Sequence, residues 1–243
     1  MQNNEIIESL YTEFRQRCIE VKRYIEFVVN LTEFKASGLA TESHGILTAI
    51  PDYEITRELT KTFRANGYLL LYNLVEATMT NAIDSIHSCI EADSLGFNDL
   101  SNEMKNISLS HFKRIIRDNH SVVLDQQAHP IEVAIARLGY EKYDIFSGNV
   151  DCTGIKQKAK QYGFPTPDPN KGGRNIAPKL RNIKDKRNAL AHGRMSFEQC
   201  GHETSPESLA DTARQTMIYL RAVLWCVSYY LRQRKYSSSS SSG

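Results

Sequence analysis

Apolar residues recur at intervals of three and four along the first part of the chain, the pattern of an amphipathic helix that buries one stripe. The stripe consists of Ile7, Leu10, Phe14, Cys18, Val21, Ile25 and Val28. It predicts one long helix. We expect this helix to end near Ser37-Gly38, because glycine suits the position just after a helix.

A second helical stripe follows after a loop through Gly45 and Pro51. This stripe consists of Leu69, Tyr72, Glu76, Met79, Ile83, Ile86 and Ile90. The helical region begins around Tyr53, and a break can occur at Asn66-Gly67, where glycine weakens a helix. Glu76 is a charged residue among apolar ones, so its carboxylate needs a partner or access to water.

The middle of the chain, from about 93 to 170, is less regular, and we interpret it as an insertion. Short helices are expected at 110–118, 130–139 and 153–162. The segment 164–173 contains three prolines and two glycines, which cannot sustain a helix. It is therefore expected to be a surface loop.

Two further helices are predicted near the end of the chain. The first starts near Pro178, a favourable first-turn residue, and stops at Gly193. The second is capped by Ser205, with Pro206 in its first position. Its buried side consists of Leu209, Ala213, Leu220, Leu224, Val227 and Leu231. With no convincing alternating strand, the pattern predicts an all-α bundle of four to five main helices.

The composition, with 41% hydrophobic and 24% charged residues in a chain of 243, is that of a globular domain. We expect one domain over 1–236 and a disordered, Ser-rich tail at 237–243. No apolar run approaches the ~20 residues of a membrane-spanning helix, and the first residues lack a signal-peptide pattern. The five cysteines are widely spaced and odd in number, which suits reduced thiols. The expected location is the cytoplasm.

Positive charge is concentrated in one segment. Between Lys171 and Arg194 there are eight Lys or Arg residues and a single acid, Asp185. These cations can form a solvated face, but their clustering favours attraction of phosphate groups. The candidate RNA-binding residues are Lys179, Arg181, Lys184, Lys186 and Arg194.

A helical wheel of this segment separates two candidate residues. Arg187 lies in the middle of the apolar side, whereas Asn188 and His192 share a polar face with Arg181 and Asp185. The side chains of Arg187 and His192 point about 140° apart, so in one straight helix they cannot grip the same small group. Another helix or another chain must complete any joint site.

Arginine keeps its charge when it is buried, so Arg187 needs a carboxylate, a phosphate or a wet interface. Glu76 has the matching requirement in the other helix. We therefore expect Glu76 and Arg187 to approach each other at one end of the bundle, or both to open onto a dimer groove. Either arrangement allows a twofold partner to supply a second Arg187 and His192.

The segment Arg187-Asn188-Ala189-Leu190-Ala191-His192 resembles the Arg-polar-x(3–5)-His motif of HEPN (higher eukaryotes and prokaryotes nucleotide-binding) proteins, which also precedes their last helix. The segments Tyr72 to Ala77, Phe146 to Asp151 and Tyr162-Gly163 are similar to a prokaryotic HEPN branch encoded beside toxin–antitoxin, restriction and phage-defence genes.

The resemblance implies an α-helical homodimer that cleaves RNA without a metal or other cofactor. By its match to the motif, Arg187 would hold the scissile phosphate, Asn188 would orient the site, and His192 would act on the 2′-hydroxyl. The chemistry suits these residues, because an imidazole exchanges protons near neutral pH and a guanidinium offers a forked donor to phosphate. Glu76 and Asp185 are supporting candidates. The resemblance also implies an antitoxin or defence-system protein as partner.

Two alternatives remain open from the sequence, and a third, a zinc site, is disfavoured. Asp185 can simply pair with Arg181, four residues before it on the same helix. His192, Cys200 and His202 lack the second tight pair of a zinc site, and the chain between them is expected to be a loop, so no metal is predicted. Finally, the chain can be a non-catalytic HEPN adaptor or nucleotide-binding module, in which the motif only organises a dimer.

Overall fold

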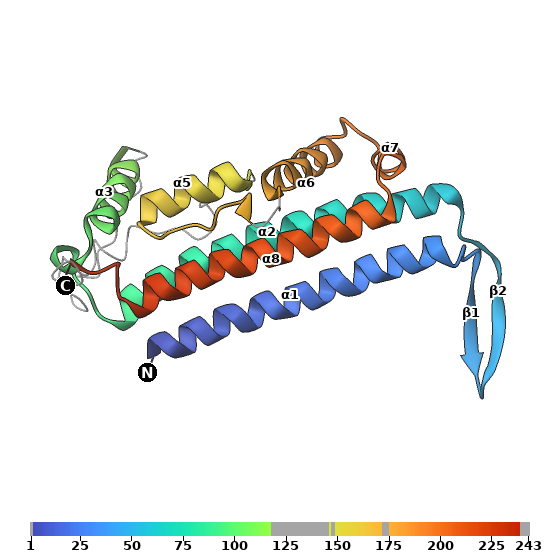
Figure 1. Cartoon of the computed structure of the whole chain (residues 1–243), viewed down its shortest axis with the longest axis horizontal. Helices are drawn as coiled ribbons and strands as arrows, with labels where there is room; N and C mark the ends of the chain where they lie inside the picture. Colours follow the sequence, from blue (N-terminus) through green and yellow to red (C-terminus); the bar gives the residue numbers. More distant parts are fainter. Residues whose placement is uncertain (1, 118–145, 147–148, 172–174, 239–243) are drawn as a thin grey trace.

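Three long helices lie side by side and form the body of the molecule, which was analysed as a computed structural model (Figure 1). They are α1 (Gln2–Glu33), α2 (Arg57–Ala92) and α8 (Pro206–Arg232). The residues that the structure describes are 2–117, 146, 149–171 and 175–238. The prediction of an all-α bundle is confirmed. Within the described residues, no helix combines the length and apolar character that crossing a bilayer requires.

The helix α2 runs without a break, contrary to the interruption expected at Asn66-Gly67. The reason is close packing at Gly67. A side chain there would begin 2.8 Å from a methyl group of Leu209 on α8 and 3.4 Å from one of Ile25 on α1. The glycine allows three helices to approach one another, and this contact outweighs its low helix propensity.

The predicted loop between α1 and α2 is instead an antiparallel hairpin, made of β1 (Gly38–Ser43) and β2 (Ile46–Glu54). His44 and Gly45 form its two-residue turn with φ angles of 52° and 79°, as expected for a hairpin turn with two left-handed residues. The hairpin projects from one end of the bundle (Figure 1), and every residue of β1 is exposed. Because neither face is buried, no alternation marked these strands.

A second layer covers α2 and α8 and consists of α5 (Cys152–Tyr162), α6 (Ile176–Ala191) and the short α7 (Phe197–His202) (Figure 1). The short 3-10 helix η1 (Phe97–Asp99) and α3 (Asn102–Arg117) lie near the other end of the bundle.

The sequence predicted the positions of some of these helices better than those of others. The helix predicted at 153–162 is α5, with Asp151 as its N-cap and Gly163 in the left-handed position after it. The one predicted at 110–118 belongs to the longer α3, and the one at 130–139 lies outside the described residues. The helix α6 begins two residues before Pro178. Ser205 caps α8 and Pro206 follows it, as predicted.

The helix α7 occupies the segment that was expected to be a loop. Ser196 and Gln199 form a capping box at its start, each side chain bonding the backbone of the other. Its Gly201 lies against the backbone of α2, where a Cβ atom would be 1.9 Å from the carbonyl oxygen of Lys61. Glycine thus allows α7 to rest directly on α2.

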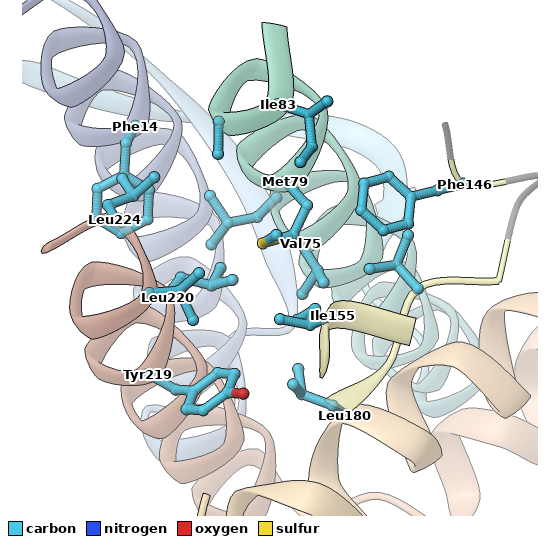
Figure 2. Close-up of a cluster of buried hydrophobic side chains, with 14 of the residues drawn as sticks. Phe14, Val75, Met79, Ile83, Phe146, Ile155, Leu180, Tyr219, Leu220 and Leu224 are labelled. Carbon is cyan, nitrogen blue, oxygen red and sulfur yellow. The ribbon is translucent and has the colours of Figure 1, made fainter. Parts of the chain in front are cut away.

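The core lies where the two layers meet. Side chains from α1, α2, α5, α6 and α8 converge there, as Figure 2 shows. They include Phe14, Val75, Met79, Ile83, Ile155, Leu180, Tyr219, Leu220 and Leu224. The pairing of α1 with α8 includes a 3.2 Å hydrogen bond that the Ser228 hydroxyl donates to the Tyr11 hydroxyl. Ser237 is buried and bridges Leu100, so the ordered chain extends into the predicted tail.

Candidate active site

The Arg187–His192 segment forms the C-terminal end of α6. His192 is the C-cap, and Gly193 adopts a positive φ of 66°. The amide of Gly193 donates to the Leu190 carbonyl at 3.2 Å, and that of Arg194 donates to the Ala189 carbonyl at 2.8 Å. These two bonds make a Schellman motif, which fixes where the helix ends. His192 is therefore held at a defined helix end, with its side chain exposed.

The guanidinium of Arg187 is half-buried between α6 and α2. Its Cζ atom lies 4.4 Å from the centre of the Tyr72 ring, within the range of a cation–π contact. Its Nη1 atom donates a 2.8 Å hydrogen bond to Oδ1 of Asn188. The charge on the apolar side of α6 is thus held by an aromatic face and a neighbouring amide.

Tyr72 also connects Arg187 with Glu76. The Tyr72 hydroxyl donates to Oε1 of Glu76 at 3.2 Å and accepts from the backbone amide of Val150 at 3.3 Å. Burial raises the pKa of Tyr72 to about 12, so the phenol stays neutral at physiological pH. Glu76 and Arg187 thus contact the same tyrosine. Their expected approach to each other, at one end of the bundle or in a dimer groove, stays a prediction.

Asn188 bridges two parts of the site. Its Oδ1 atom accepts from Arg187, while its Nδ2 atom donates at 3.1 Å to Oδ1 of Asn149, in the chain just before α5. Both the oxygen and the nitrogen of the side-chain amide are therefore hydrogen-bonded, which fixes the orientation of the Asn188 side chain. This geometry is compatible with the orienting role that the sequence predicted.

The structure does not bring His192 and Arg187 together within one chain. His192 is exposed at the helix end, and Arg187 faces Tyr72. Asp185 is also exposed. Among the described residues, Asp185 and Arg181 form no ion pair, so the alternative in which they pair along α6 is not realised. Within one chain the arginine and the histidine therefore stay apart.

Three of the five candidate RNA-binding cations form ion pairs inside the protein. The pairs are Lys179 with Asp211 at 2.5 Å, Lys184 with Asp151 at 2.6 Å, and Lys186 with Glu203 at 3.5 Å. Lys186 also lies 4.9 Å from the centre of the Tyr68 ring. These lysines attach α6 to neighbouring segments, which reduces the charge they offer to RNA. Arg181 and Arg194 are exposed.

Sequence reasoning gave no role at the site to Tyr72 or Asn149, and it predicted Asp151 only as a candidate cap of the helix at 153–162. All three contribute to the site. Each belongs to a segment that resembles the HEPN branch, Tyr72 to Ala77 or Phe146 to Asp151, and this was the only available signal. Residues 147 and 148 of the second segment lie outside the described residues.

The comparison with protein families extends these observations over most of the chain. The model of the MAE_28990-like HEPN family matches residues 6–236. The chain belongs to the HEPN family. No curated protein and no solved structure matches it significantly. The HEPN match includes α1 to α8 almost completely, so the hairpin and the middle segment lie inside the matched region.

Membership in the HEPN family bears on how the arginine and the histidine of this site are interpreted. The segment Arg187 to His192, which resembles the HEPN motif, lies before the final helix, and its arginine contacts Tyr72 of α2. Within the described part of this HEPN chain, no three His, Cys, Asp or Glu side chains gather as metal ligands would.

Proposed function

We propose that this HEPN protein is an endoribonuclease that cleaves RNA without a metal ion. The observation that carries the proposal is the fixed position of the Arg187 guanidinium, between Tyr72 and Asn188 at the end of α6. A cation held in place needs little reorganisation when charge develops on a phosphate. The exposed His192 lies at the end of the same helix.

The reaction needs one base and one anchored cation. His192 accepts the proton of the ribose 2′-hydroxyl, and the 2′-oxygen attacks the adjacent phosphorus. Arg187 stabilises the negative charge on the phosphate oxygens through its forked donors. The bond from phosphorus to the 5′-oxygen breaks, and that oxygen takes up a proton. The products are a 2′,3′-cyclic phosphate and a 5′-hydroxyl.

The site is complete only in a dimer. Arg187 and His192 diverge by about 140° on one helix, and His192 does not meet Arg187 in the protomer. A twofold axis beside the end of α6 would place the histidine of one subunit near the arginine of the other. Arg194, just after the end of α6, and Arg181, in the first half of the helix, are both exposed and would contact the RNA backbone.

A cleavage assay in EDTA tests the proposal. The wild-type protein is incubated with transfer, ribosomal and messenger RNA, and the product ends are identified. We expect cyclic phosphate ends, and His192→Ala should abolish cleavage without changing the size of the dimer. His202→Ala is the matched control, since His202 is another exposed histidine ten residues further on. Activity retained in His192→Ala would overturn the catalytic role.

A second candidate function is a non-catalytic HEPN adaptor. The observation that favours it is the internal bonding of Arg187, whose guanidinium already contacts Tyr72 and Asn188. An arginine used in this way can organise an interface without touching RNA. Intact RNA over the whole substrate panel, with normal dimers, would support the adaptor.

The proposed biological role is that of a toxin or anti-phage effector, restrained by an antitoxin or another defence protein. Induced expression in bacteria is expected to stop growth, and His192→Ala should restore it. Growth arrest that persists in this variant would separate toxicity from the HEPN site.

A further inference from the structure

The outer side of α8 and the turn that follows it carry exposed aromatic and cationic side chains in one row. This row, which we call the α8 ridge, consists of Arg214, Ile218, Arg221, Trp225, Tyr229, Arg232 and Lys235. Trp225 is 65% exposed and Tyr229 is 45% exposed. Apolar side chains of this size normally contribute to a core, so a row of them in water indicates a binding surface.

The aromatic members of the ridge are already stacked. The rings of Trp225 and Tyr229 lie nearly parallel, with 16° between their planes and 6.2 Å between their centres. The Lys235 ammonium lies 5.0 Å from the centre of the Tyr229 ring. This arrangement holds the Trp225 ring in place, with most of its surface open to a further flat group.

The charge of the ridge has one sign. From 212 to 238 the chain has five Lys or Arg residues and no acid. Two of the five are neutralised from outside this segment, Arg214 by Asp211 and Arg234 by Asp93. Among the described residues, Arg221, Arg232 and Lys235 have no acidic partner. Cations thus flank the aromatic stack on both sides along the helix.

A shallow pocket of about 260 Å³ continues the ridge toward α6. Ala222, one turn before the exposed aromatic pair, lines it, together with Tyr219 and Ile176 at the start of α6. Pro167 and Pro169 line it as well, together with one acid, Asp168, and one cation, Lys171. Flat apolar walls with a cation beside them suit a heterocyclic ring.

We propose that the α8 ridge binds an unpaired stretch of RNA, with a base stacked on Trp225 and phosphates on Arg221 and Arg232. This inference rests on the proposed ribonuclease function and adds where the substrate is held. Stacked aromatic rings between cations are the usual means of binding single strands without sequence preference. The ridge borders the start of α6 and the motif lies at its end, ~24 Å away at 1.5 Å per residue, so the RNA would reach both.

The charges favour RNA over a second copy of the chain. A twofold contact through the ridge would bring Arg221 and Arg232 near the same cations of the partner, which is unfavourable. A membrane is also disfavoured, because the other side of α8 is buried in the bundle and only three large apolar side chains face outward.

The test uses the fluorescence of Trp225, the only tryptophan in the chain. Full-length His192→Ala protein is titrated with a twelve-nucleotide oligouridylate, and we expect quenching that saturates. Fluorescence anisotropy of a labelled oligonucleotide should show binding ~10-fold weaker or more for Trp225→Ala, and within ~2-fold of the parent for Trp225→Phe, which retains a stacking ring. Replacing both Arg221 and Arg232 with alanine should lower the slope of log affinity against log salt by ~1.4.

The other outcomes are distinct. Unquenched Trp225 with equal affinity in Trp225→Ala would overturn the proposal. A fluorescence change that depends on protein concentration alone, with Trp225→Ala converting dimers to monomers, would also overturn it, because the ridge would then bind a second copy of the chain. Quenching by phosphatidylserine vesicles that RNA does not compete away would overturn it as well. Quenching of Trp225 without RNA cleavage by the wild type would support RNA binding at the α8 ridge and refute the proposed nuclease activity. His192-dependent cleavage without quenching would refute only RNA binding at the α8 ridge.

Discussion

At the scale of the residue, the central feature is a permanent cation that is kept in place by an aromatic ring. Stacking of Arg187 on Tyr72 at 4.4 Å contributes on the order of 1 kcal/mol and offsets part of the cost of removing the guanidinium from water. The hydroxyl of the same ring connects to Glu76 and to the Val150 amide. One side chain thus positions the charge and satisfies buried polar groups.

The two roles of Tyr72 can be separated by substitution. Tyr72→Phe retains the ring beneath Arg187 but leaves the buried Val150 amide unbonded, so we expect a loss of about 1–3 kcal/mol in the free energy of unfolding and nearly unchanged RNA cleavage. Tyr72→Leu removes the ring and should lower cleavage strongly at comparable stability loss. Urea unfolding and the cleavage assay measure the two effects, and equal activity of the two variants would refute the positioning role.

The residues of this site differ in how far the sequence could reveal them. Arg187 and Glu76 were predicted, because a charge on an apolar stripe is visible in one helix. The ion-paired state of Lys179, Lys184 and Lys186 was not, since their acidic partners lie 17 to 33 residues away. Tyr72 looked like an ordinary core residue, because a buried aromatic ring gives no sign of what stacks on it.

At the scale of the element, Asp151 joins α5 to α6. Its Oδ1 atom accepts from the amides of Thr153 and Gly154 at the start of α5, and its Oδ2 atom pairs with Lys184 of α6. Burial raises the pKa of Asp151, but the bonds from Lys184 and the two amides outweigh it, and the net pKa is lowered from 3.8. Its stabilising contribution is therefore complete above that ordinary value and declines as the pH falls through the lowered one.

Asp151→Ala should lower the free energy of unfolding by about 1–3 kcal/mol at pH 7, since it removes a helix cap and leaves Lys184 without its partner. The difference from the wild type should shrink as the pH falls below 3.8. Urea unfolding at several pH values measures this. Asp185→Ala, at an exposed acid on the same helix pair, should change stability by no more than about 0.5 kcal/mol. If the difference in free energy of unfolding between the wild type and Asp151→Ala stays constant as the pH is lowered, the ion pair contributes nothing to stability.

The elements that the sequence misplaced share a cause. The hairpin, the unbroken α2 and the short α7 are each decided by contacts, or by a lack of contacts, between distant segments. Gly67 and Gly201 weaken a helix locally but allow close approach to Leu209 and Lys61. Periodicity reports only which face is buried, so it found α1, α6 and α8 and gave no information about the hairpin.

At the scale of the whole molecule, the separation of Arg187 from His192 makes a quantitative prediction about subunits. Inactive Arg187→Ala and His192→Ala proteins are mixed after reversible unfolding. Random pairing makes half of the dimers mixed, and each mixed dimer has one intact site of two, so about one quarter of wild-type cleavage should return. A site contained within one chain would give no recovery, and neither would a site that needs all four residues.

The pairing of α1 with α8, marked by the bond between Tyr11 and Ser228, has a consequence for the order of synthesis. While the ribosome is producing the middle of the chain, α1 has only α2 to cover its apolar stripe, and the remainder is open to chaperones. Before α8 has been made, the second layer can rest on α2, but the core side chains that α8 contributes, such as Leu220 and Leu224, are still missing. Under the proposed ribonuclease function, this order would leave the fold incomplete while the message is being translated.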